Sequence, residues 1–199
     1  FHLGLYHEAL MKKKSKDNNP INEKNPFIEL DDMRNSIKEY YESALRIESK
    51  SFNALLNIGS IYASENSEKS TSNAEFYYKK ALKINQNDWR INLNLAFLNM
   101  KEKSYDIALE YFEKTIEILG DKIDKKILSP YIFCLYKEKC WKKLEKYSKK
   151  VLKIDKKDKK AFIYLLEALK YRKDFRQCND LLNKLKTKLK KVKNNRKKE

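Results

Sequence analysis

Side chains suited to acid–base or metal chemistry are scarce in this chain. The two histidines, His2 and His7, are five residues apart, whereas a helical metal pair is usually separated by four. The sequence contains no glycine-rich phosphate loop and no His-Glu-x-x-His, Cys-x-x-Cys or Gly-x-Ser-x-Gly motif. We therefore interpret both histidines as surface or packing residues. We expect neither an enzyme nor a protein with a cofactor or metal site.

The three cysteines, Cys134, Cys140 and Cys178, lack the spacing of a disulfide framework or a zinc site. Cys134 and Cys140 are six residues apart, which places them on different faces of a helix. Cys178 stands where helical spacing predicts a small buried residue. We therefore expect free thiols within the core of a protein from a reducing compartment.

The most pronounced chemical feature of the chain is its excess of basic residues. The chain has 45 Lys/Arg and 28 Asp/Glu, which gives a net charge of +17. Residues 1–136 are balanced, with 20 basic and 20 acidic residues, whereas 137–199 hold 25 basic and 8 acidic residues. The segment 184–199 holds nine Lys/Arg and one Glu, and its closely spaced basic residues are Lys190, Lys191, Lys193, Arg196, Lys197 and Lys198.

Three interpretations of this charge remain open. The first is non-specific contact of the basic half with the phosphates of RNA or DNA, and the second is a nuclear import signal in the tail. The third is compositional, because abundant Lys, Asn, Ile and Tyr are typical of A+T-rich coding and lysines are readily solvated on helix faces. Few aromatic residues interleave with the tail, which argues against sequence-specific recognition of RNA.

The elements that carry these side chains recur about every 34 to 37 residues. The pattern Tyr41-x2-Ala44-Leu45-x-Ile47 returns at Tyr78 and Phe112, and more weakly at Ser148 and Leu182. Such a period predicts stacked supersecondary units that bury a continuous core between neighbours. The chain has only 3 Gly and 3 Pro, which favours helices joined by short loops over strands.

The clearest unit spans 89–120. Apolar residues at helical spacing predict one helix from Trp89 to about Lys101 and a second from Tyr105 to about Leu119. The polar residues 102–104 form the turn between them, and Gly120 is a suitable C-cap.

The small and aromatic residues of these units resemble the tetratricopeptide repeat. The sequences Ile58-Gly59-x2-Tyr62 and Ala74-x3-Tyr78 match its two helices, and Leu95-Ala96 with Ala108-x3-Phe112 gives the next match. In the following unit Leu144 and Ser148 replace the small and aromatic residues. The resemblance covers about 31–185 and implies an all-α fold, a right-handed α-solenoid of stacked antiparallel helix pairs.

The resemblance divides the chain into four parts. Residues 1–11 are expected to form the first helix of a partial repeat, 33–185 the repeats, and 186–199 a basic helical extension or tail. The segment 12–32 is rich in Lys, Asn, Asp and Pro, and we predict a disordered insertion because it cannot bury enough apolar surface. A smaller insertion is predicted over 65–72. Because the chain begins at Phe1, we expect a piece of a longer protein.

Pro130 requires a separate explanation, since a proline inside a helix removes a hydrogen bond and clashes with the preceding turn. We predict that Ser129 is an N-cap and that Pro130 is the first residue of a helix.

In such an array the first helix of each pair lines the concave face. By analogy with the family, the groove residues include Asn57, Arg90, Asn94, Phe97, Lys101, Lys126, Phe133, Tyr136, Tyr164 and Tyr171. This aromatic and basic groove suits an extended or helical peptide with acidic and apolar residues. Chaperone-binding members of the family hold a carboxylate with a set of Lys, Asn and Arg residues. That clamp is mostly absent here, because Leu56, Ser60 and Pro130 occupy three of its positions.

Two hypotheses of function follow. The first is a scaffold that assembles a multiprotein complex through its concave groove. The stretch Leu93-Asn94-Leu95-Ala96 through Tyr105-x2-Ala108 resembles tetratricopeptide scaffold subunits of the RNA polymerase II elongation (Paf) complex and of the anaphase-promoting ubiquitin ligase. That resemblance implies a role in the nucleus, for instance in transcription elongation. The second hypothesis is a helical-repeat protein that binds RNA or DNA through 137–199. The sequence has no run of 18 apolar residues, so we expect no membrane span. With the scaffold hypothesis and the free thiols, we expect an intracellular location, nuclear or cytoplasmic.

Overall fold

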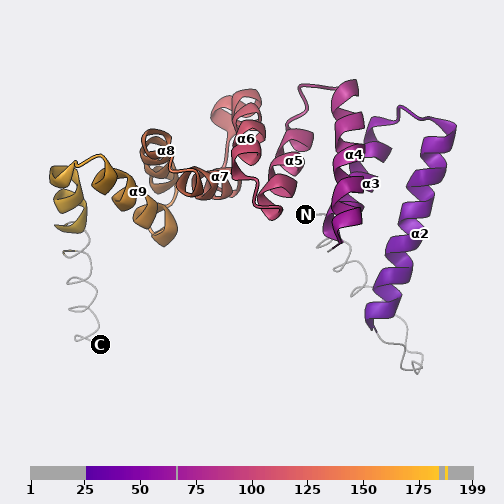
Figure 1. Cartoon of the computed structure of the whole chain (residues 1–199), viewed down its shortest axis with the longest axis horizontal. Helices are drawn as coiled ribbons and strands as arrows, with labels where there is room; N and C mark the ends of the chain where they lie inside the picture. Colours follow the sequence, from indigo (N-terminus) through magenta and orange to yellow (C-terminus); the bar gives the residue numbers. More distant parts are fainter. Residues whose placement is uncertain (1–25, 66, 184–186, 188–199) are drawn as a thin grey trace.

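The computed structural model of the chain describes residues 26–65, 67–183 and 187. Its helices follow one another in chain order along the long axis of the molecule (Figure 1). They are α2 (Pro26–Ile47), α3 (Phe52–Ser64), α4 (Glu68–Ile84), α5 (Trp89–Lys101), α6 (Tyr105–Leu119), α7 (Lys125–Lys137), α8 (Trp141–Ile154) and α9 (Lys159–Tyr171), with a short 3-10 helix η1 (Gly120–Lys122). Residues 175–183 are also helical. No strand occurs in the part of the chain that the structure describes, and the predicted all-α solenoid is confirmed.

The helices pair as the repeat pattern predicts. Helix α3 packs on α4, α5 on α6 and α7 on α8, while α9 precedes the helical residues 175–183. The α3/α4 and α5/α6 pairs place the small residues Ala74 and Ala108 at buried positions, where two helices approach closely. The second helix of each pair then packs against the first helix of the next, so the core continues along the array.

The core consists of two neighbouring clusters. One is built from α3, α4 and α5 and includes Leu55, Ile58 and Tyr78. The other runs from α5 to α9 and includes Phe112, Tyr131 and Leu135. Helix α5 contributes to both, because Leu95 faces the first cluster and Ala96 the second.

Aspartates begin the first helices of three successive units. The side chains of Asp88, Asp124 and Asp158 accept hydrogen bonds from the backbone N–H groups of residues 90, 127 and 161. Each bond satisfies a donor that the first turn of a helix leaves without a partner.

The turns at 102–104, 138–140 and 172–174 share one geometry, which places a lysine in the left-handed region. Lys103, Lys139 and Lys173 have φ values of 63°, 54° and 57°. The N–H of the residue that follows each lysine donates to a carbonyl five residues earlier, at 2.9, 2.9 and 3.0 Å. These bonds close the C-terminus of the first helix in the manner of a Schellman motif.

A helix begins inside each of the two predicted insertions. Helix α2 begins at Pro26, so the prediction of disorder over 12–32 is wrong for 26–32, while 12–25 lie outside the described residues. A proline suits the first position of a helix, and the apolar residues that follow it have helical spacing. The second insertion was predicted over 65–72, but α4 already begins at Glu68, where Ser67 Oγ accepts from Ser70 N.

The predicted role of Pro130 is also wrong. Helix α7 begins at Lys125 behind the Asp124 cap, and Pro130 lies inside it. Ser129 Oγ is buried and has no hydrogen-bond partner, so Ser129 does not act as a cap. Asp124 is the stronger N-cap, and the lost hydrogen bond of one proline is compensated by the buried face of α7, with Ile127, Leu128 and Tyr131.

All three cysteines are free thiols. Cys134 is buried, and burial raises its pKa to about 12. Cys140 and Cys178 are half-buried, so the expected full burial of Cys178 is not observed.

Candidate functional site

The predicted groove residues lie on the first helices of the pairs, namely α3, α5, α7 and α9. Helix α3 contacts α5, and α7 contacts α9. Helices α3, α5 and α7 each pack one face against the paired second helix, and the groove was predicted on another face. The residues of that face decide what the site binds.

Four aromatic rings form a connected cluster at one end of this row. The rings of Tyr136 on α7 and Tyr164 on α9 stack with centroids 4.9 Å apart and planes at 26°. The rings of Trp141 and Tyr171 stack at 4.7 Å, also at 26°. The rings of Tyr136 and Trp141 meet edge-on, with centroids 6.4 Å apart, and this contact joins the two stacks. We refer to Tyr136, Trp141, Tyr164 and Tyr171 as the aromatic cluster.

The aromatic cluster is accessible to a ligand. Tyr171 is 65% exposed, and the other three rings are half-buried. Burial, together with the neighbouring Tyr136, raises the pKa of the Tyr164 hydroxyl, so this group stays protonated and can donate a hydrogen bond at neutral pH. Trp141 was not among the predicted groove residues, because it begins a second helix and only the packing brings it to Tyr171.

A lysine joins the next pair of rings. Phe133 on α7 meets Tyr105 edge-on, with centroids 5.6 Å apart. The Lys137 ammonium lies 5.4 Å from the Phe133 centroid and 6.0 Å from that of Tyr105, within the range of cation–π attraction. The exposed Lys137 thus presents a positive charge beside a largely apolar surface.

The rest of the predicted groove has fewer accessible rings. Phe97 on α5 is 38% exposed and meets Phe112 edge-on at 5.7 Å. Asn94 is half-buried, and Lys126 at the start of α7 is exposed.

Three predicted groove residues are engaged in contacts within the fold. Asn57 Nδ2 donates to the Tyr41 hydroxyl at 3.1 Å. The Arg90 guanidinium donates to the carboxylate of Asp88, with Nη2 to Oδ2 at 2.7 Å. Lys101 Nζ donates to the carbonyl of Glu65 at 2.7 Å, at the end of α3. Because their polar groups already have partners, we leave these three residues out of the proposed contact surface.

The remaining predictions concern chemistry and the tail. Within the described ranges, no group of three or more His, Cys, Asp or Glu side chains is arranged to hold a metal ion. None of the described helices combines the length and the apolar character needed to cross a membrane. The histidines and the basic tail residues 190–198 lie outside the described residues.

Comparison with known proteins identifies the fold. No family model matches the sequence, and no curated protein matches it either. Among solved structures, YrrB, described as a tetratricopeptide protein with an unusual peptide-binding site, is similar with a TM-score of 0.64 and 18% identity, over 80% of this chain and 79% of YrrB. The MamA protein gives a TM-score of 0.65 and 14% identity, over 83% of this chain and 88% of MamA.

A third similar structure is that of a protein complex. In the Naa15/Naa10 complex bound to HypK-THB, the matched chain gives a TM-score of 0.61 and 13% identity, over 76% of this chain but only 22% of that one. These likenesses establish that the chain has the fold of tetratricopeptide repeat proteins. At such identities they do not extend to its ligands.

Proposed function

We propose that this chain is a protein-interaction module whose concave surface over α7 and α9 binds a peptide segment carrying aromatic or apolar residues together with acidic ones. The observation that carries the proposal is the aromatic cluster. Rings from two adjacent repeats are stacked on one another yet remain accessible, so a ligand side chain can bury further area without reorganising the surface.

The charges around the cluster favour an acidic ligand. Lys160, Ile163, Tyr164, Glu167 and Tyr171 share one face of α9 by their spacing. Ile163 is 54% exposed, which adds an apolar contact beside Tyr164. Lys137 of α7 contributes a further positive charge on the neighbouring helix, and a carboxylate there gains charge-assisted hydrogen bonds.

The fold supports the same class of function. YrrB is described as having a peptide-binding site, and the Naa15/Naa10 structure is a complex. Stacked helix pairs provide an extended concave surface and are used widely to hold partners. The narrower assignment to the nucleus and to transcription elongation rests on a shared repeat motif, and it stays a prediction.

A paired-variant pull-down tests the proposal. Tagged chain would be incubated with nuclease-treated lysate from its source cells and washed at moderate salt. The groove variant Tyr171→Ala/Lys137→Glu changes two exposed residues. The control variant Tyr40→Ala/Lys50→Glu makes the same changes at exposed residues of α2 and of the turn that follows α2. Proteins that bind the wild type and the control but not the groove variant are the expected result. Equal recovery by all three would overturn the proposal.

The charge asymmetry supports a second candidate, binding of nucleic acid by 137–199. Binding through phosphates weakens steeply with salt, because each neutralised phosphate releases counterions. Affinity for a labelled single-stranded RNA that falls steeply between low and moderate salt and is lost on removal of 184–199 would support it. Unchanged affinity of the shortened chain would contradict the assignment to the tail.

A further inference from the structure

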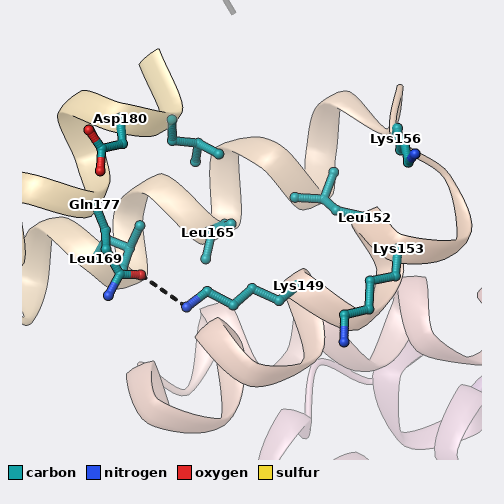
Figure 2. Close-up of a pocket in the computed structure, with 9 residues that line it drawn as sticks. Lys149, Leu152, Lys153, Lys156, Leu165, Leu169, Gln177 and Asp180 are labelled. Atoms are coloured by element: carbon teal, nitrogen blue, oxygen red, sulfur yellow. Dashed lines mark hydrogen bonds between the residues drawn. The ribbon is translucent and has the colours of Figure 1, made fainter. Parts of the chain in front are cut away.

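A pocket of about 440 Å³ lies between α8, α9 and the helical residues 175–183 (Figure 2). Its apolar lining is provided by Leu152, Leu165, Leu169 and Leu181. Leucines from three separate helices converge here, so the pocket is a product of the stacking and not of one segment.

The pocket is separate from the aromatic cluster. At 100° per residue, Leu165 and Leu169 project from roughly the opposite face of α9 to Ile163 and Glu167. A ligand in the pocket therefore does not compete directly with a peptide on the concave surface.

Three lysines of α8 and the turn after it, Lys149, Lys153 and Lys156, stand around the leucines. Lys149 Nζ donates to Glu145 Oε1 at 2.7 Å and to Gln177 Oε1 at 3.1 Å, and it bridges from α8 to the last helical segment (Figure 2). Lys153 and Lys156 are exposed. Asp180 is the single acidic residue among those that line the pocket.

We propose that this pocket docks an acidic amphipathic segment of a partner protein. Apolar side chains one helical turn apart enter the leucine-lined floor, and flanking carboxylates pair with Lys153 and Lys156. The positive charge of the lysines around the pocket favours an acidic occupant. The chain's own segment 184–199 has nine Lys/Arg and one Glu, and a second copy of the chain carries +17, so both are repelled by the lysine rim.

The probe is a fluorescein-labelled helical peptide with leucines on one face and glutamates flanking them. Its comparison peptide has the same composition with the leucines distributed around the helix. Fluorescence anisotropy with the full chain measures affinity. Leucine-methyl NMR spectra of the same samples locate the bound peptide.

The pocket variant is Lys153→Glu/Lys156→Glu. Its matched control is Lys80→Glu/Lys83→Glu, which makes the same charge change at the same spacing on the second helix α4. All four lysines are exposed, so neither variant disturbs the core. We expect the pocket variant to weaken binding at least about tenfold and the control less than about twofold. The methyl signals of Leu152, Leu165, Leu169 and Leu181 should shift.

Three results would overturn the proposal. Equal weakening in both variants would indicate general attraction between opposite charges. Equal affinity for the scrambled peptide would show that the leucine floor is not used. An increase in affinity on removal of 184–199 would identify that segment as the occupant. The concave-surface variant Tyr171→Ala/Lys137→Glu should bind the probe like the wild type. The outcome of this experiment is therefore independent of whether the proposed concave site binds a peptide.

Discussion

Gly59 of α3 lies directly against the ring of Tyr78 of α4. A Cβ atom added at Gly59 would be 2.7 Å from the Cδ1 and Cε1 atoms of that ring. The ring cannot withdraw easily, because Tyr78 is 2% exposed and its hydroxyl donates to Ser60 Oγ at 3.1 Å. The close approach of α3 to α4 therefore requires glycine at this position.

The first prediction is that Gly59→Ala lowers the free energy of unfolding by about 1–3 kcal/mol, the usual cost of overpacking a core. Helix propensity alone predicts the opposite sign, a gain of about 1 kcal/mol. Urea unfolding followed by circular dichroism distinguishes the two. The double variant Gly59→Ala/Tyr78→Leu should lose less than the sum of its single changes. A stabilised Gly59→Ala would refute the packing argument.

The second prediction concerns the equivalent positions two repeats later. Ala96 and Phe112 follow Gly59 and Tyr78 after one repeat, and Ile132 and Ser148 follow after two. All four of these later residues are buried. As the residue on the first helix grows, the one on the second shrinks. We infer from this trend that the small Ser148 leaves space for Ile132.

Ser148→Phe, which restores the aromatic of the repeat, should therefore destabilise the protein by about 1–3 kcal/mol. Combining it with Ile132→Ala should recover part of the loss. Ser148→Ala should be neutral or stabilising, because Ser148 Oγ is buried without a hydrogen-bond partner. Thermal unfolding of the three variants is the measurement. A stabilising Ser148→Phe on its own would show that the space beside Ile132 is open.

The third prediction uses the left-handed lysines of the turns. Lys139 has a φ of 54°, which costs an L-residue about 1–2 kcal/mol relative to glycine, partly offset by the entropy that glycine gains when unfolded. Lys139→Gly and Lys103→Gly should each raise the free energy of unfolding by up to about 1 kcal/mol. Lys142→Gly, inside α8, should lower it by about 1 kcal/mol. If all three variants lose stability, the turn backbone is not strained.

The fourth prediction concerns Glu145, which is only 8% exposed and carries a buried charge. Burial by itself would raise its pKa, but hydrogen bonds from Lys149 and Arg172 outweigh burial and lower the pKa below its ordinary value of 4.5. A carboxyl whose folded pKa is lowered stabilises the fold above its unfolded pKa and loses that contribution as the pH falls through the folded pKa.

Glu145→Gln should therefore lower the free energy of unfolding by about 1–3 kcal/mol at neutral pH. The difference from the wild type should shrink as the pH falls below 4.5. Chemical unfolding between about pH 3 and pH 7 measures this dependence. Glu117→Gln, an exposed change on α6, serves as the control. A difference between Glu145→Gln and wild type that does not vary with pH would exclude the proposed ion pairs as its source.

The repeat period was sufficient to predict the helix pairs. The clearest unit was placed with its turn at 102–104 as observed. Two of the wrong predictions of helix boundaries involve a proline, where the local preference of proline competes with helix formation. Pro26 begins a helix within a polar segment, and Pro130 lies inside a helix that tertiary packing stabilises.

The candidate site was predictable only in part. Analogy with the family assigned Phe133, Tyr136, Tyr164 and Tyr171 to the first helices, where they lie, and their role in binding stays a prediction. It did not identify Trp141 or Tyr105, which reach the surface from second helices through contacts between separate elements. The pocket at Leu152 was not predicted at all, since its leucines resemble ordinary core residues in the sequence.

The reciprocal sizes of Gly59 with Tyr78 and Ile132 with Ser148 restrict how this chain evolves. A large residue is tolerated at one position only after the facing position has become small, so the two substitutions are epistatic and their order matters. Recombination that exchanges one helix between repeats would bring two large or two small residues together. A chimera that keeps both members of each pair should therefore fold where one that divides them fails.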